Sequence, residues 1–239
     1  MIAGEFMMKE SEGKKVLSII IPAYNEAATV KELLERVTRL RAPFKKEVIV
    51  VDDASTDATA RIAQSFGRNV KLVRHSMNQG KGAAIRTGIK HCTGLYTIIQ
   101  DADLEYDPKD YLPLWNAAVK HGLQVVYGSR FSGNRAYPIG AHGFGNKFLT
   151  FMTNLLFSSK LTDMETCYKL MQTSLLKSLP LKASKFDFEP EVTSLLLKRG
   201  IRIREVPITY HPRTALQGKK IHWKDGLQAL RALFRERFS

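Results

Sequence analysis

Four acidic side chains follow directly on an apolar run in the stretch IIQDADLEYD, residues 98–107. They are Asp101, Asp103, Glu105 and Asp107. Alternate side chains of an extended chain point the same way, so Asp101 and Asp103 project together with the small Ala102 between them. Carboxylate oxygens suit Mg²⁺ and Mn²⁺, and Mg²⁺ usually leaves other positions to water and substrate phosphates. The spacing therefore predicts a metal-diphosphate site, against the simpler interpretation of a solvated turn.

The elements that must position these carboxylates are buried strands that alternate with helices. Apolar runs predict strands over 16–24, 47–53, 71–75, 95–100, 124–130 and 201–211. Helical periodicity and capping residues predict helices over 30–40, 55–67, 80–91, 108–122, 144–159, 189–200 and 222–238. This alternation is typical of an α/β protein with a mostly parallel sheet covered on both faces. Such sheets bind ligands beyond the carboxyl ends of their strands, where the acidic residues lie.

Two other predicted strands end at the same edge of the sheet in polar residues. The second strand ends in VVDDASTD, where Asp52 and Asp53 precede the residues that cap the next helix. One of these carboxylates can accept a hydrogen bond from a nucleobase N–H. The first strand ends in PAYNE, which presents Tyr24 for stacking and Glu26 as another acceptor. Three strand ends thus converge on chemistry that suits a nucleotide.

Five segments, IIIPAYNE, VIVVDDASTD, NQGKGAAIRTG, DADLEYDP and GSRF, resemble in their order and spacing the family 2 glycosyltransferases. They are most similar to the dolichyl- and polyprenyl-phosphate sugar synthases, and the resemblance covers roughly residues 16–225. It implies the GT-A fold, with a mostly parallel central sheet and helices on both faces. It also implies inverting transfer of a hexose from a nucleotide-diphosphate sugar of the GDP-mannose or UDP-glucose type, with Mg²⁺ or Mn²⁺ as cofactor.

The resemblance further implies which residues hold the donor. The positions that match the base and ribose site are Pro22, Tyr24, Glu26, Val51 and Asp53. The metal and diphosphate motif matches Asp101, Ala102 and Asp103, with Glu105 as a third ligand where mannose synthases often have Gln. Basic residues that clasp phosphates match Arg130, Arg213 and Lys219. The expected catalytic residues are Asp101, Asp103, Arg130 and Asp163.

Two kinds of acceptor stay open. A lipid phosphate is already anionic near neutral pH and needs positioning more than deprotonation. A hydroxyl acceptor, as in polysaccharide or glycolipid synthesis, needs a general base, for which Asp163 in LTDMETCYK is the candidate. Many relatives have an Asp followed by a Ser-Gly-aromatic-Arg pattern at this place, where this chain has DMETCYK. We expect a polyprenyl or dolichyl phosphate acceptor.

The charge balance favours an anionic partner, such as a nucleotide phosphate, a nucleic acid or an acidic membrane surface, and composition does not choose among these. Lys and Arg number 37 against 23 Asp and Glu, which gives a net charge of +14 and favours anionic partners. The apolar segment 144–159 and the basic segment 222–238 can lie in a membrane interface, or instead form packing or homo-oligomer contacts. No apolar run reaches the ~20 residues of a membrane span, and residues 1–15 lack the apolar core of a signal peptide. We expect a cytoplasmic enzyme, peripheral on the cytoplasmic face of a membrane, with a membrane-protein partner as a further option.

Other classes of protein fit the sequence less well. A nucleotidyltransferase should carry a glycine- and lysine-rich turn in place of PAYNE. A nucleic-acid-binding protein would explain the charge but not the clustered carboxylates, which repel phosphate, so no nucleic-acid partner is expected. NQGKG, with Gly80 and Gly82, lacks the phosphate-loop pattern. We expect residues 1–15 to be disordered, with a cloning leftover before Met7, and residues 16–239 to form a single catalytic domain ending in an amphipathic helix.

Overall fold

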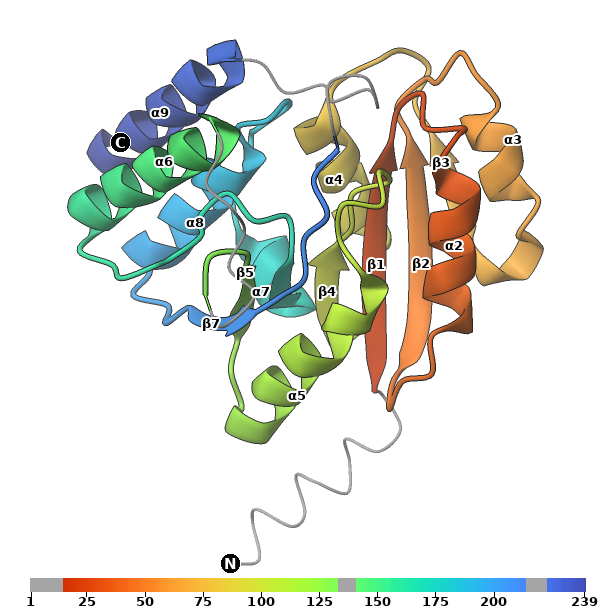
Figure 1. Ribbon diagram of the computed structural model, residues 1–239, viewed down its shortest axis with the longest axis horizontal. Coiled ribbons are helices and arrows are strands. Elements are labelled where there is room, and N and C mark those ends of the chain that lie inside the picture. Colours follow the sequence, from red (N-terminus) through yellow and green to blue (C-terminus); the bar gives the residue numbers. More distant parts are fainter. Residues whose placement is uncertain (1–14, 133–140, 214–222) are drawn as a thin grey trace, which may run out of the picture.

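The computed structural model describes residues 15–132, 141–213 and 223–239, which contain a seven-stranded sheet flanked by helices (Figure 1). The strands are β1 (Val16–Ala23), β2 (Lys45–Asp52), β3 (Lys71–Arg74), β4 (Tyr96–Ile99), β5 (Val125–Ser129), β6 (Lys169–Gln172) and β7 (Arg204–Pro207). The helices are α2 (Val30–Arg39), α3 (Thr59–Gln64), α4 (Lys81–His91), α5 (Tyr111–His121), α6 (Ala141–Phe157), α7 (Thr173–Ser178), α8 (Phe188–Lys198) and α9 (Trp223–Phe238). Short 3₁₀ turns are η1 (Gly67–Asn69) and η2 (Pro108–Asp110). The expected disordered segment lies outside the described residues, apart from Lys15.

One half of the sheet, made of β1 to β4, is entirely parallel. The strand order is β3-β2-β1-β4. The chain thus moves outward from β1 to β3 and then crosses back to the other side of β1 to form β4. Because parallel crossovers are right-handed, α2 and α3 cover one face and α4 covers the other. The register places Ala23 opposite Asp52 and Asp52 opposite Arg74, so the carboxyl ends of three strands meet at one edge. The prediction of a mostly parallel sheet with helices on both faces is confirmed.

The other half contains a strand that sequence patterns did not predict. β6 runs antiparallel to both β4 and β5, between which it lies, while β7 pairs in parallel with β5. β6 has only four residues and begins with Lys169, which is fully buried. Because β6 follows immediately on residues 163–168, it brings that loop beside the end of β4.

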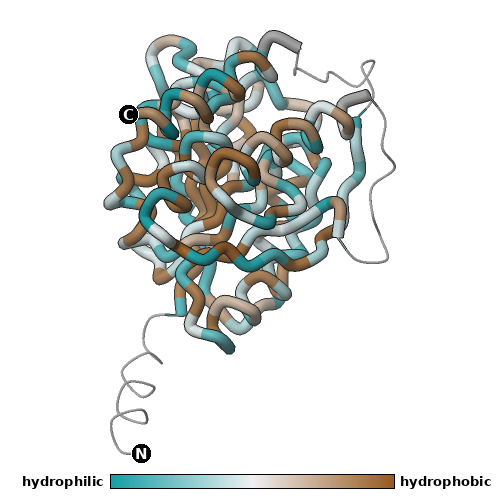
Figure 2. The backbone as a smooth tube through the Cα atoms, turned by 90° about the vertical axis from the view of Figure 1, so that its left-hand side faces the viewer, coloured by the Kyte–Doolittle hydropathy of each residue, from teal (hydrophilic) through white to brown (hydrophobic). Residues whose placement is uncertain are grey.

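Helices α6, α8 and α9 gather on one side of the molecule, away from β1 to β3 (Figure 1). They enclose a small second core, separate from the large core around the sheet. Its buried members are Leu149, Leu161, Met164, Ala229 and Leu233. Figure 2 views this side, and brown apolar residues recur along the helices nearest the viewer.

Candidate active site

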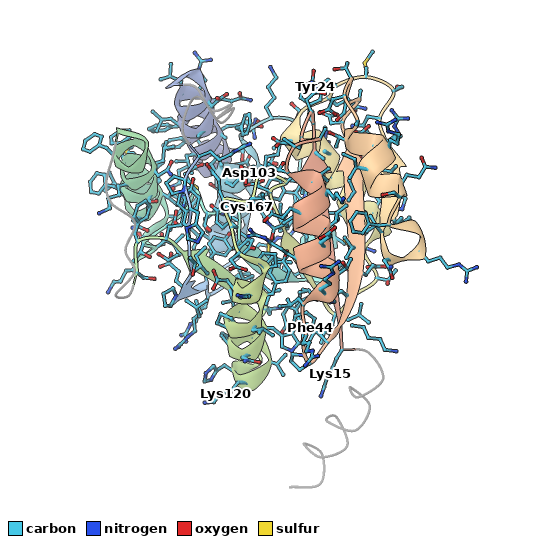
Figure 3. All side chains as sticks on the ribbon, turned by 45° about the vertical axis from the view of Figure 1, so that its right-hand side comes forward. Lys15, Tyr24, Phe44, Asp103, Lys120 and Cys167 are labelled. Carbon is cyan, nitrogen blue, oxygen red and sulfur yellow. The ribbon has the colours of Figure 1, made fainter. Side chains whose placement is uncertain are left out.

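The acidic turn follows β4, and the hydrogen-bonded side chain of Gln100 fixes its first residue. The side-chain oxygen of Gln100 accepts hydrogen bonds from the hydroxyls of Tyr111 at 2.5 Å and Tyr168 at 2.6 Å. Its amide nitrogen donates to the backbone carbonyl of Asp101 at 2.9 Å. A buried amide whose groups are all satisfied fixes the chain as it leaves the strand. Figure 3 shows Asp103 and Tyr24 toward the same end of the molecule, with Lys15 at the opposite end.

Asp101 is held by a lysine that the sequence analysis did not single out. The ammonium of Lys81 lies 2.8 Å from the Asp101 carboxylate and 2.9 Å from that of Glu189. Burial opposes the charge on Lys81, but Asp101 and Glu189 raise its pKa well above the ordinary value. Lys81 therefore stays charged and fixes one oxygen of Asp101. Its position at the start of α4, directly after Gly80, was the available signal.

The first turn of α4 is closed against another part of the chain. The amides of Gly82 and Ala83 donate to the carbonyls of Lys185 and Ser184 at 3.1 Å each. A Cβ at Gly80 would lie 2.3 Å from the Ser184 carbonyl oxygen. Glycine is thus needed at position 80 for this close approach, and the first backbone amides of α4 donate hydrogen bonds to the segment 183–185.

Asp103 lies among like charges. One of its oxygens accepts the Glu105 backbone N–H at 3.1 Å, and the other pairs with Arg213 at 3.0 Å. Burial, Asp101 and Glu105 raise the pKa of Asp103 to about 7, and Arg213 offsets only part of that rise. The ionised form of Asp103 is therefore disfavoured, first by burial and then by the neighbouring carboxylates.

The carboxylate of Glu105 is bound by the segment 210–213. It accepts hydrogen bonds from the Tyr210 hydroxyl and from the Arg213 backbone N–H, each at 2.7 Å. Among the described residues no group of three or more His, Cys, Asp and Glu side chains is arranged as a metal site. The structure thus places Asp101 and Asp103 on one turn but does not bring Glu105 into a ligand set with them.

A divalent cation fits two of the three expected ligands. Asp101 and Asp103 offer oxygen atoms at a strand end. Burial, and then Asp101 and Glu105, raise the pKa of Asp103, and a bound cation would favour its ionised form. Two carboxylates with water and substrate phosphates are a usual ligand set for Mg²⁺. Glu105 is not grouped with them as a third ligand among the described residues, and its oxygens accept hydrogen bonds from residues 210–213.

The expected base and ribose residues lie at the ends of β1 and β2. Pro22 and Val51 are buried neighbours in the register of the two strands, and Tyr24 is 39% exposed. Glu26 accepts a hydrogen bond from Thr29 at 2.9 Å. The structure brings these residues to the same edge as the acidic turn.

The two adjacent aspartates at the end of β2 are not equivalent. Asp53 accepts the backbone N–H groups of Gln79 at 2.9 Å and Gly80 at 2.7 Å, and His75 lies 2.6 Å from its carboxylate. It therefore anchors the loop before α4. Asp52 is fully buried, and its Oδ1 has no hydrogen-bond partner among the described residues.

Arg130 and Asp163 form a closed pair on the other side of the site. Two guanidinium nitrogens of Arg130 donate to the two Asp163 oxygens at 2.7 Å each, and the Arg130 backbone N–H donates at 2.9 Å. Asp163 is fully buried and Arg130 is 6% exposed. The guanidinium also lies over the Tyr210 ring, 5.1 Å from its centroid. The Asp163 carboxylate is thus committed to Arg130.

The loop that carries Asp163 is braced by charges that no motif predicted. Glu205 accepts the backbone N–H groups of Thr162 and Asp163. The buried ammonium of Lys169 donates to the carbonyls of Met164 at 2.6 Å and Thr166 at 2.5 Å. Burial lowers the pKa of Lys169 to about 8. This bracing fixes the position of Asp163 relative to Arg130.

Arg213 joins the separate parts of the site. Its guanidinium lies 3.3 Å from the Glu26 carboxylate and 3.0 Å from that of Asp103. It therefore connects the loop after β1 with the turn after β4. The other basic residue expected in this loop, Lys219, lies outside the described residues.

Comparison with known sequences agrees with this geometry. The family described as Glycosyl transferase family 2 matches residues 18–179. A dodecaprenyl-phosphate galacturonate synthase of Rhizobium johnstonii is 29% identical over 203 residues, which are 82% of this chain and 59% of that protein. A dolichyl-phosphate beta-glucosyltransferase of Dictyostelium discoideum is 26% identical over 244 residues, with 93% of this chain and 74% of that protein covered.

Comparison with solved structures confirms the predicted GT-A fold. A crystal structure of glucosyl-3-phosphoglycerate synthase from Mycobacterium tuberculosis, in complex with Mn²⁺, uridine diphosphate and glucosyl-3-phosphoglycerate, matches with a TM-score of 0.74. The match covers 97% of this chain and 83% of that one at 19% identity. At this identity the likeness shows the fold alone.

Proposed function

The chain belongs to glycosyl transferase family 2, and on that premise we propose that it transfers a hexose from a nucleotide-diphosphate sugar to a polyprenyl or dolichyl phosphate. The observation that carries the proposal is Arg213, which joins Glu26 and Asp103 where the strand ends meet. A guanidinium at that place suits a diphosphate held between the base side and the acidic turn. The names of the two sequence relatives support the lipid-phosphate acceptor.

On the donor side, each group has a proposed task. The base and ribose would lie against Pro22, Tyr24, Glu26, Val51 and Asp53. Asp101 and Asp103 would hold Mg²⁺ or Mn²⁺, which when bound stabilises negative charge on the departing nucleoside diphosphate. Lys81 keeps Asp101 oriented, and Arg213 and Lys219 would contact the diphosphate oxygens. The Mn²⁺ and uridine diphosphate bound by the solved relative support this assignment.

On the acceptor side, the geometry favours a phosphate over a hydroxyl. A phosphate oxygen can attack the anomeric carbon opposite the diphosphate, whose bond to that carbon breaks with its electron pair leaving on the nucleoside diphosphate. No proton has to be removed. A hydroxyl would need a base, and the candidate Asp163 is buried and fully engaged by Arg130. We therefore assign Asp163 the task of orienting Arg130, which would help to hold the acceptor phosphate.

The membrane part of the proposal rests on an exposed apolar stripe. On α6 the spacing of four side chains places them along one helix face, and we call them the α6 stripe. They are Phe144, Phe148, Phe151 and Leu155, which are 71%, 46%, 61% and 65% exposed. None of the described helices is long and apolar enough to cross a bilayer. A helix that exposes aromatic residues in a strongly basic chain suits an anionic membrane interface.

Helix α9 exposes fewer apolar side chains for membrane contact than its sequence indicates. Ala229 and Leu233 are buried in the second core, so much of its apolar face is occupied. Its exposed apolar side chains are Leu227, Phe234 and Phe238. The basic residues Arg231 and Arg237 are exposed on the same helix. We assign α9 mainly an electrostatic part in the proposed attachment.

A transfer assay with paired acceptors tests the proposal. The purified protein is incubated with radiolabelled UDP-glucose or GDP-mannose, Mn²⁺, and either a polyprenyl phosphate or the polyprenol of equal length. We expect transfer to the phosphate only, and loss of transfer with EDTA. Transfer to the polyprenol or a soluble hydroxyl acceptor, without transfer to the phosphate, would contradict the proposal and restore Asp163 as the candidate base.

A further inference from the structure

The segment that carries Arg213 is attached to the acidic turn through its backbone. Residues 209–213 follow β7 and run beside the residues after Asp103. Tyr106 and Tyr210 form an isolated antiparallel bridge, and the His211 N–H donates to the Glu105 carbonyl at 2.8 Å. The segment 209–213 thus packs along the acidic turn.

The side chain of Glu105 makes the attachment specific. Its Oε2 accepts the Tyr210 hydroxyl and its Oε1 accepts the Arg213 N–H, both at 2.7 Å, and the residue is only 7% exposed. Leu104 has φ +64°, a left-handed conformation that is unusual for leucine. Such a conformation persists where surrounding contacts hold it, and here it accompanies the turn that points Glu105 toward residues 210–213.

The position of the Arg213 backbone determines what its guanidinium can reach. With its N–H held by Glu105, the side chain spans to Glu26 at 3.3 Å and to Asp103 at 3.0 Å. The Arg213 side chain is 16% exposed, so it is packed in the site. A segment that moved away from Glu105 would carry the guanidinium away from both carboxylates.

We propose that Glu105 is a positioning residue that seats Arg213 in the proposed donor site. The proposal rests on the proposed function for what Arg213 binds, whereas the anchoring itself depends only on contacts within this chain. Glu105 acts through Arg213 and touches neither the sugar nor the reacting bond.

The chemistry of the partners explains why a carboxylate stands here. A backbone N–H is always a donor, and the Tyr210 hydroxyl also donates, since burial and Glu105 raise the pKa of Tyr210. A carboxylate offers an acceptor oxygen to each partner. A glutamine offers one oxygen and an amide that donates, so it can keep the Arg213 N–H only if the Tyr210 hydroxyl turns to accept. Glu105→Gln should therefore loosen the segment while keeping the shape of the side chain.

Hydrogen exchange tests the anchoring without any ligand. Amide exchange of residues 204–213 is compared by mass spectrometry in the wild type, Glu105→Gln and Glu105→Ala. We expect exchange at least about tenfold faster in Glu105→Ala, on the scale of one lost hydrogen bond to a charged group, and an intermediate rate in Glu105→Gln. Asp107→Asn, in the same acidic turn but without a contact to the segment, should exchange like the wild type. Unchanged exchange in both Glu105 variants would overturn the anchoring.

Nucleotide binding separates positioning from metal ligation. UDP and GDP are each titrated into the wild type, Glu105→Ala, Arg213→Ala and the double variant over a range of Mn²⁺ concentrations. We expect both single variants to weaken nucleotide binding by a similar factor, about tenfold, the double variant to be no weaker, and the half-saturating Mn²⁺ concentration to stay within twofold. Additive losses with a raised Mn²⁺ requirement would overturn the proposal. A wild type that binds neither nucleotide would instead overturn the proposed donor site, and the exchange result would still decide the anchoring.

Discussion

The region of the proposed donor site and the region of the proposed acceptor site are built in different ways. In the first, parallel strand ends carry aspartates that are tied to neighbouring loops, as Asp53 is to Gln79 and Gly80. In the second, three helices surround a small core, and α6 presents aromatic side chains to the outside. A small polar donor needs fixed polar partners, whereas a lipid acceptor needs access to the bilayer. The contrast is what a transferase between water and membrane would require.

The charges differ between the two regions as well. At the acidic turn, Lys81 and Arg213 each bridge two carboxylates, and the pKa of Asp103 is still raised. On the acceptor side, Arg130 and Asp163 neutralise each other in a buried pair. In the first region a buried carboxyl has a raised pKa, whereas in the second the Asp163 carboxylate is fully engaged by Arg130. Changes in the two regions should therefore affect different properties.

The largest effect is expected from Asp103→Asn. Transfer should fall about 10²- to 10³-fold, the scale of losing one electrostatic contact to the transition state, because a proposed ligand charge disappears. The free energy of unfolding should not fall, because burial and the charges of Asp101 and Glu105 disfavour an ionised Asp103 in the folded state. Initial rates in Mn²⁺ and thermal melting measure the two quantities, with Asp107→Asn as the control. If Asp103→Asn turned over at the wild-type rate, Asp103 would not be a metal ligand, and the proposed difference between the two regions would not hold.

The next effect concerns the buried pair, where stability should change before chemistry does. Asp163→Asn leaves the Arg130 guanidinium buried without its counter-charge, which typically lowers the free energy of unfolding by about 3–5 kcal/mol. Glu32→Gln, which breaks the exposed pair with Arg36, should lower it by less than about 1 kcal/mol. Urea unfolding measures both. An Asp163→Asn variant of normal stability that loses transfer to a hydroxyl acceptor would identify Asp163 as a base after all.

Sequence patterns predicted the parallel strands and the residues at their carboxyl ends better than the rest of the fold, for a physical reason. Apolar runs that end in polar residues identify parallel strands and the edge where they bind ligands, so Asp53, Asp101 and Asp103 were placed beforehand. β6 was missed because its buried Lys169 is stabilised by carbonyls of the preceding loop. No local pattern reveals that a lysine will be buried in this way.

Local sequence patterns also could not predict which residues contact the site residues. Lys81 meets Glu189, and Glu105 meets Tyr210, across more than a hundred residues in each case. Such pairs exist only once the sheet has brought distant segments together. Residues 144–159 were expected to form an apolar helix for a membrane interface, for packing or for a homo-oligomer contact. The residues of the α6 stripe were not singled out, because periodicity cannot tell which face of a helix stays uncovered.

A smaller effect is expected from the α6 stripe. The double change Phe148→Ser and Phe151→Ser should weaken binding to anionic vesicles by at least about tenfold, because burying one Phe is worth about 1.5–3 kcal/mol. Val119→Ser on α5, a side chain 47% exposed on another helix, should leave vesicle binding unchanged. Vesicle sedimentation at low salt measures both. Equal binding by the double variant and the wild type would place the membrane contact elsewhere.

The smallest effect is a pH dependence on the acceptor side. Burial and Glu189 raise the pKa of Glu165 to about 8, while Lys169, Arg130 and Asp163 also face it. A carboxyl whose folded-state pKa lies above its unfolded value, about 4.3, binds more protons in the folded state, so its contribution to stability falls as pH rises between these values. Glu165→Gln should therefore melt higher than the wild type at pH 8, with a smaller difference at pH 5. Melting curves at the two pH values measure this, and an advantage at pH 5 that vanishes at pH 8 would show that Lys169 keeps Glu165 ionised.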